Sequence, residues 1–161
     1  MESNSSGVNT FNFRSFKVDQ VALNMVPNIQ ILELANYAQY DWDINLRVRH
    51  VTFFTKVKVY VAGLDCELSL FQKTPTGRVA TPAVTLNIGC AGSFSSENRL
   101  PKEVEEQIVK LQFTALMFTQ LRGAISAILA NSGYGSVLLP LVNVPAMFEK
   151  KLDQIQIHQV E

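Results

Sequence analysis

Apolar and polar residues alternate with a period of two through much of the first half of the chain, as in strands with one buried face. The clearest run starts at Trp42, where Trp42, Ile44, Leu46 and Val48 alternate with charged or amide residues. Turn residues separate the runs and favour hairpin connections, so a four-stranded antiparallel sheet is expected. Its strands are predicted at about residues 9–26, 42–54, 57–72 and 83–94.

Interruptions of the alternation indicate local irregularities. Phase slips near Ser15 and Gln20 indicate bulges in the first strand, and Gly63 suits a bulge in the third strand. Between the first two strands, residues 29–40 carry many apolar side chains without a clean period. We interpret this stretch as an apolar crossover segment.

The second half of the chain changes to a helical period. Pro101 suits the first turn of a helix, and the glutamates after it complement the positive end of the helix dipole, so a long helix is predicted over residues 101–131. Its apolar residues form two stripes, and the second stripe calls for another subunit or a client. Asn143 suits the N-cap of a short final helix over residues 144–157. Together these elements predict an α+β fold in a single domain, 1–161.

Composition narrows the classes of partner. The formal net charge is zero, and charged residues make up only 17% of the 161 residues, against a usual level of about 25%. Such a surface has no electrostatic footprint for nucleic acid. Residues 1–8 are polar and unlike a secretory signal, so a disordered start and a cytoplasmic protein are expected. Gln120 and Arg122 interrupt the most apolar run, which argues against membrane insertion.

Sequence motifs for catalysis are scarce. The chain has no nucleophile elbow, no phosphate-binding glycine loop and no H-E-x-x-H motif. Cys66 and Cys90 alternate like the core residues of strands, so packed thiols are expected rather than a metal site. The expectation is a protein that is not an enzyme and that needs no cofactor and no metal.

Polar residues near the second strand have a structural interpretation. Asp41 and Asp43 resemble paired carboxylates, but Arg47 and Arg49 on the same strand face offer charge compensation. His50 continues the apolar parity of its strand and is interpreted as a packed or edge histidine. One alternative remains open, a small-ligand-binding or hydrolytic domain that uses an apolar pocket near the tryptophan with the histidine as polar anchor.

Apolar side chains at irregular positions are the strongest functional signal in the sequence. They occur in the crossover segment and in the apolar loop between the two predicted helices, where together they could line a groove for an extended polypeptide. Binding there would gain about 25 cal/mol for each Å² of apolar surface buried, without requiring a particular client sequence. The candidate client-binding residues are Leu32, Leu34, Tyr37, Tyr40, Trp42, Phe113, Met117, Val137, Leu138 and Leu139.

Short segments spread along the chain carry a resemblance to a known family. Residues 121–135 and 139–148 look like the Arg-bearing helix and the Leu-x-Pro-Val-Asn-Phe-x-x-Leu-Phe segment of the SecB protein-export chaperones. The pair Asp41-Trp42 resembles the Asp-Trp of that family's crossover, and residues 91–94 resemble the Gly-Gly-x-Phe that closes its fourth strand. The resemblance covers most of the chain.

The resemblance implies an assembly. In the SecB family, protomers pair by their sheets, two dimers stack through the helices, and clients lie in grooves beside the helices and the crossover. A homotetramer is therefore expected, and a helix that is apolar on two sides suits such stacking. The candidate interface residues are Val84, Leu86, Ile88, Leu116, Leu121 and Ile125.

The chain departs from the family at the surface that docks on the SecA motor. Family members that deliver clients to SecA are typically acidic, with carboxylates on the sheet, whereas this chain is neutral. The family's acidic positions fall near Val21, Met25 and Asn87, none of which is acidic. SecA stays a candidate partner, but the acidic residues of the usual docking surface are absent.

The predicted function is that of an ATP-independent holdase that binds unfolded preproteins through an apolar groove and keeps them soluble for export. The alternative keeps the fold and changes the task. In that case the protein is a dedicated chaperone or adaptor for one client, for example in a toxin–antitoxin system, without docking on SecA. The breadth of client binding distinguishes the two hypotheses.

Overall fold

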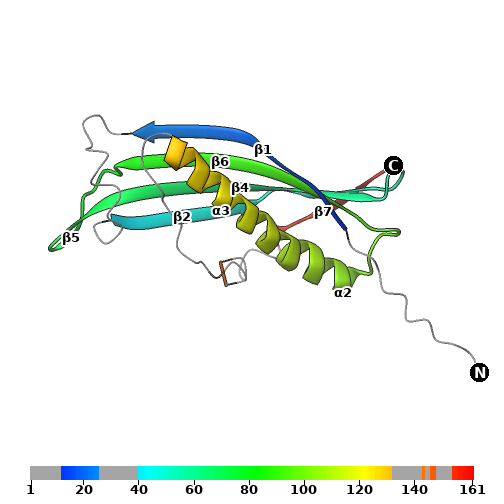
Figure 1. The fold of residues 1–161 in the computed structure, drawn as a ribbon. Helices are drawn as coiled ribbons and strands as arrows, with labels where there is room; N and C mark the ends of the chain where they lie inside the picture. The colour runs from blue at the N-terminus through cyan, green and yellow to red at the C-terminus, as the bar shows by residue number, and fades with distance from the viewer. Residues whose placement is uncertain (1–11, 26–39, 132–142, 144–145, 148–153) are drawn as a thin grey trace, which may run out of the picture.

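The computed structural model describes residues 12–25, 40–131, 143, 146–147 and 154–161. A single twisted sheet is crossed diagonally on one face by a long helix (Figure 1). We call the face under the helix the inner face and the opposite face the outer face. The strands are β1 (Asn12–Met25), β2 (Tyr40–Val48), β3 (Val51–Phe54), β4 (Val59–Thr74), β5 (Gly77–Arg78), β6 (Val84–Ser95) and β7 (Ile157–Val160).

The sheet is larger than predicted. Its order is β1-β6-β4-β3-β7, and β2 and β5 also pair with β4, so seven strands are present among the described residues. The prediction of a four-stranded antiparallel sheet is wrong, because the short strands were missed and because β7 pairs with β3 in parallel. The strand expected over residues 42–54 is divided into β2 and β3, which pair with successive parts of β4.

Irregularities in the strands agree only in part with the sequence pattern. The register of β1 against β6 shifts between Phe13 and Ser15 and again between Val18 and Gln20, which confirms both phase slips. The pairing of β4 with β6 passes through Gly63 without a shift, so the bulge expected there is wrong. Gly63 has a different role, in the packing of an arginine described below.

The long helix consists of α2 (Lys102–Glu105), the π-helical segment η2 (Glu106–Phe113) and α3 (Thr114–Leu129). Pro101 stands at the N-cap, where its missing N–H costs no hydrogen bond. A period of 3.6 residues does not reveal the π geometry, in which each hydrogen bond spans five residues. The sequence therefore located the helix but not its internal winding.

The core lies between the helix and the inner face. The ring of Phe94 on β6 stacks on Tyr60 of β4 and meets the edge of Phe113, with centroid distances of 4.7 Å in both pairs. Gly92 permits this close approach, because a Cβ there would come within 3.0 Å of Phe113 Cζ. The largest fully buried side chains are Tyr60, Phe94, Phe113, Leu46, Leu64, Leu86, Met117, Leu121 and Ile125.

The C-terminal segment differs from the predicted helix over residues 144–157. Asn143 caps a helical turn as expected, since its Oδ1 accepts a hydrogen bond from the N–H of Ala146 at 3.2 Å. The helix does not extend to residue 157, because Ile157–Val160 forms β7. Ile155 and Ile157 alternate with Gln156 and His158, a period of two that a strand satisfies and a helix does not.

Candidate functional site

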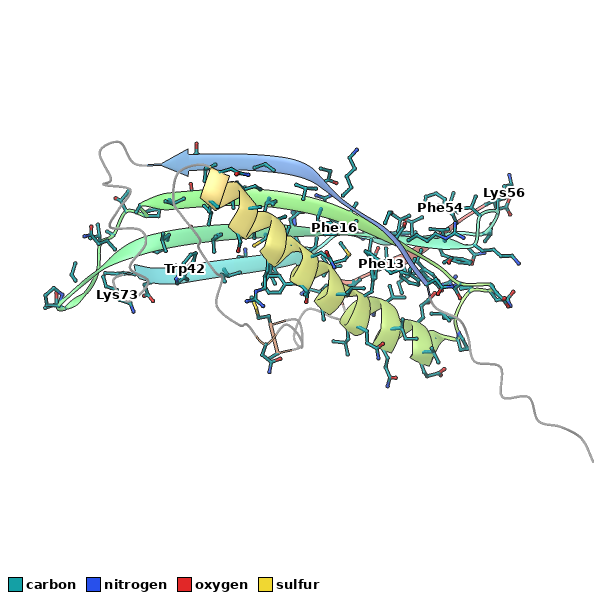
Figure 2. All side chains as sticks on the ribbon, in the orientation of Figure 1. Phe13, Phe16, Trp42, Phe54, Lys56 and Lys73 are labelled. Atoms are coloured by element: carbon teal, nitrogen blue, oxygen red, sulfur yellow. The ribbon has the colours of Figure 1, made fainter. Side chains whose placement is uncertain are left out.

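Apolar side chains at the margins of the inner face are only partly covered. On β2, Trp42, Ile44 and Val48 are half-buried and pack against the core, while Leu46 between them is fully buried. Trp42 pairs with Leu70 of β4 and lies to one side of the helix (Figure 2). We call Trp42, Ile44 and Val48 the β2 band.

A second set of apolar side chains lies on β1, at the other margin of the sheet. Phe16, Val18 and Leu23 are half-buried, whereas Val21 is 49% exposed. Phe13 is also exposed, although its ring centroid lies 6.1 Å from that of Phe113 (Figure 2). The helix thus leaves apolar surface on both sides of its path.

The helix also has a second, partly exposed apolar stripe. Its buried stripe includes Met117, Leu121 and Ile125. The residues of the second stripe are half-buried, so the helix has apolar side chains on two sides, as the sequence predicted. They are Val104, Ile108, Leu111, Ala115, Leu116, Ala124 and Ile128.

The candidate client-binding residues are distributed unevenly in the structure. Trp42 lies in the β2 band, and Tyr40 begins β2. Phe113 and Met117 are each only 1% exposed, so their side chains belong to the protomer core and are not available to a client. The other candidates lie outside the described residues. These are Leu32, Leu34, Tyr37, Val137, Leu138 and Leu139.

Most candidate interface residues occupy the core rather than the surface. Leu116 alone of this set is only half-buried. The assignment of the others to an interface between protomers is corrected, because alternate residues of β6 face the helix and are already covered within one chain. The covered side chains are Val84, Leu86, Ile88, Leu121 and Ile125.

The outer face is polar and is organised around Arg49. Its guanidinium donates hydrogen bonds to Asp65 Oδ1 at 2.6 Å and to Asp19 Oδ2 at 2.7 Å. To reach Asp19 on β1, the side chain lies flat over Gly63 of β4 and Gly89 of β6. A Cβ at Gly63 would stand only 2.5 Å from Arg49 Cδ, and one at Gly89 would clash with the guanidinium. Both glycines are therefore needed to pass the arginine across the sheet.

Hydrogen bonds to Arg49 shift the pKa values of its partners. The pKa of Asp19 is lowered, chiefly by the hydrogen bond from Arg49. Burial raises the pKa of Asp65, but hydrogen bonds from Arg49 and Arg47 outweigh this effect and keep the pKa below its ordinary value. Both carboxylates are thus ionised and neutralised within the protomer at neutral pH.

The expected compensation of Asp41 and Asp43 uses a different arginine. Arg78 of β5 lies 2.8 Å from Asp43 and 3.8 Å from Asp41. Arg47 and Arg49 pair with Asp65 instead. The hairpin that returns β5 along β4 brings Arg78 to this position, a contact that period-two alternation does not indicate.

A buried polar network ties the start of the helix to the sheet. The hydroxyl of Tyr60 donates to Glu105 Oε1 at 2.6 Å and accepts from the N–H of Leu100 at 3.0 Å. Arg99 donates to the same carboxylate, and its Nη1 reaches Gln159 on β7 at 2.8 Å. Burial and the bond to Glu105 raise the pKa of Tyr60. The sequence pattern predicted only an interaction of the helix glutamates with the dipole and did not indicate this network.

Comparison with known proteins gives a likeness in structure. The chain matches no protein-family model and no curated protein in sequence. Its structure is similar to that of the Mycobacterium tuberculosis SecB-like chaperone Rv1957, solved in complex with a ChAD peptide from the antitoxin HigA1. The TM-score is 0.58 at 11% identity, over 83% of this chain and 91% of the other. The fold is SecB-like. This finding confirms the resemblance at the level of the fold and does not extend it to the export family.

Both cysteines of this SecB-like fold are buried free thiols. Burial raises the pKa of the Cys66 thiol to about 12 and that of Cys90 to about 11, which keeps both protonated and unreactive. Among the described residues there is no cluster of potential metal ligands, and none of the helices is long and apolar enough to cross a membrane. Trp42 and His50 are eight positions apart, roughly 26 Å along extended chain, so they do not form one pocket.

Proposed function

We propose that the protein is a chaperone of the SecB-like type, which binds extended apolar segments of another polypeptide without ATP and without catalysis. The observation that carries this proposal is the SecB-like fold together with apolar side chains left partly covered on both sides of α3. An extended client could bury this surface in steps. Each Å² of apolar area removed from water would contribute about 25 cal/mol.

We favour a narrow range of clients over general export. The SecB-like neighbour holds a peptide from an antitoxin, which supports a dedicated client at least as well as a general holdase. The outer face also favours a narrow range of clients. Its Asp19 and Asp65 carboxylates are neutralised by Arg49, and residue 87 is an uncharged asparagine. Among the described carboxylates of this face, Glu67 beside Asn87 is exposed and accepts a hydrogen bond only from the Asn45 side chain, so one uncompensated carboxylate remains where the resemblance expects an acidic surface. Assembly through the partly exposed stripe of the helix is part of the same proposal.

Suppression of aggregation tests the function. Several unrelated unfolded proteins and one antitoxin-type client would be diluted from denaturant with equimolar chaperone, and light scattering would be followed without nucleotide. Suppression of some clients supports the proposal, and the number of clients held separates the general from the dedicated form. Absence of suppression for every client would contradict it.

Trp42 provides the site-specific form of the test. Trp42→Ala is expected to weaken client capture about ten-fold, since loss of a large aromatic anchor costs more than 1.4 kcal/mol. Val57→Ala is the matched control, because Val57 is an exposed apolar residue in the turn between β3 and β4, and its neighbour Lys56 lies at the opposite end of the sheet from Trp42 (Figure 2). Equal capture by both variants would remove the β2 band from the client site.

A further inference from the structure

The C-terminal segment occupies an edge of the sheet as a short added strand. β7 pairs in parallel with β3, from Val51 opposite Ile157 to Phe54 opposite Val160. Its ladder is only four residues long, and parallel pairs are less stable per residue than antiparallel ones. Three of its four residues are exposed. β7 therefore contributes little apolar burial beyond its first residue.

The remaining attachments of β7 are near the surface. Arg99 donates a hydrogen bond to the Gln159 side chain at 2.8 Å, and Thr55 donates to the Val160 carbonyl at 3.0 Å from its N–H and at 3.1 Å from its hydroxyl. The rings of His50 and His158 meet edge to face at a centroid distance of 5.2 Å. Exposed hydrogen bonds of this kind are worth little in net free energy.

The main anchor of the segment lies just before β7. Ile155 is only 8% exposed and packs with the core, and Ile157 is half-buried against it. Both side chains also line a cavity of about 350 Å³, which is otherwise lined by Leu100 and by charged residues, namely Arg99, Lys102, Glu105, Glu106 and Lys110. A segment with larger apolar side chains at these two positions would extend into this space, beside Leu100 and the aliphatic stems of the lysine and arginine side chains.

We propose that residues 155–160 are an exchangeable occupant of a peptide-binding edge. The edge of β3 and the adjoining cavity bind an extended client segment with large apolar residues at positions i and i+2, which adds to the sheet in place of β7. Main-chain hydrogen bonds to β3 hold the client, and the core packing that now holds Ile155 and Ile157 selects its apolar side chains. This inference rests on the proposed function, since it adds a second contact point for the same clients.

The ladder geometry identifies a variant that releases β7. The N–H of Val51 donates to the Gln156 carbonyl at 3.1 Å, and the N–H of Thr55 donates to the Val160 carbonyl. With Val51 opposite Ile157, the N–H of His158 also faces β3. His158→Pro therefore removes a ladder donor from an exposed residue. His158→Ala keeps the N–H and is the matched control.

The experiment measures peptide binding by fluorescence anisotropy in the full-length chain. The probe is the labelled octapeptide Gln-Phe-Gln-Phe-His-Gln-Val-Glu, which copies residues 154–161 with phenylalanine in place of both isoleucines. A probe with proline in place of histidine is the negative control. His158→Pro is expected to bind the probe about ten-fold more tightly than the wild type or His158→Ala, because more molecules have an open edge. Equal binding in all three proteins would overturn the proposal.

Hydrogen exchange in the unaltered protein gives a test that does not depend on how a variant folds. The amides of His158 and Val160 are expected to exchange much faster than those of Leu64 and Leu86 in the sheet centre. Exchange of β7 together with the sheet centre would show that the strand is not separable, and so would overturn the proposal. A dimer that dissociates in His158→Pro would instead assign the edge to a second copy of the chain, which also overturns the client assignment.

Aggregation suppression measured on the same proteins separates this inference from the proposed function. If clients are held but the probe does not bind, the inference fails and the function stands. If the probe binds to His158→Pro but no client is held, the edge is supported and the holdase function fails.

Discussion

The outer face depends on single residues whose contacts reach across several strands. Arg49 directly follows β2, while Asp19 lies on β1, with β4 and β6 between them in the sheet. A side chain can cross two strands only if nothing stands up from them. Gly63 and Gly89 meet that condition, so the ion pairs and the glycines form one structural unit.

Replacement of Gly89, one of the two glycines under the Arg49 side chain, should destabilise the protein. Gly89→Ala places a methyl group where the guanidinium lies, so Arg49 must move and leave partly buried carboxylates. The expected loss is roughly 1–2 kcal/mol in free energy of unfolding, between the values for surface and buried ion pairs. Urea denaturation measures it. Gly123→Ala is the control, since open space surrounds that helical position and stability should rise by about 0.5–1 kcal/mol.

The same ion pairs predict an acid dependence of stability. Because the pKa values of Asp19 and Asp65 are lowered in the folded state, their contribution is present above the unfolded pKa of about 3.9 and is lost as pH falls through the folded values. In Arg49→Met the free energy of unfolding should therefore depend less steeply on pH below about 4. Denaturation across an acid pH series would measure the slopes. Lys56→Met, which removes an exposed lysine elsewhere, should keep the original slope; equal slopes in both variants would exclude the Arg49 pairs as the cause.

At the scale of elements, the long helix has one apolar stripe that stabilises the fold and a second that is available for interactions. One stripe packs on the sheet, and a second is only half-buried. The π segment η2 winds differently from the α-helical parts before and after it, so it changes which side chains meet the sheet. Within α3, Leu116 and Met117 are neighbours that lie about 100° apart around the helix axis, so Leu116 is half-buried and Met117 is fully buried.

Alanine substitutions at these neighbours should have different effects. Met117→Ala empties a fully buried position and is expected to cost about 2–5 kcal/mol of stability. Leu116→Ala should cost about 1 kcal/mol, since only part of its surface is buried. Chemical denaturation measures both changes. Leu116→Ala should in addition weaken self-association or client capture, and a variant with normal assembly and normal capture would contradict a role for the second stripe.

At the scale of the whole molecule, a SecB-like sheet and helix leave more apolar surface than one protomer covers. The net charge of zero adds no repulsion between copies, so association through the second stripe is not opposed electrostatically. The β2 band, the β1 margin and the β3 edge surround this stripe. A client and a second subunit would then share the same side of the protomer.

Association should make thermal stability depend on concentration. If the stripe is an interface, the Tm should rise with protein concentration, because assembly stabilises the folded state by mass action. Multi-angle light scattering over the same range would report the mass directly. A charged replacement, Leu116→Glu, should lower the mass and remove the concentration dependence of the Tm. If the protein is a monomer at every concentration, the second stripe is not a subunit interface, and only client binding remains as its role.

Individual elements show how much of the structure the local sequence pattern predicts. The alternation from Trp42 located β2, and the phase slips near Ser15 and Gln20 located real register shifts. The candidate site was found less well. Hydrophobicity marked Phe113 and Met117 as client contacts, although both belong to the core, because apolarity does not say which protein a side chain will meet.

The sequence by itself determined which face of each long strand is buried and where the helix lies, because these depend on local periodicity. The tertiary structure decided which distant residues meet. It placed Arg49 against Asp19, 30 residues away, and the chain end at residues 157–160 against β3. Such contacts depend on the order of strands in the sheet, and that order follows from how the whole chain buries its apolar surface together, a property that no local pattern contains.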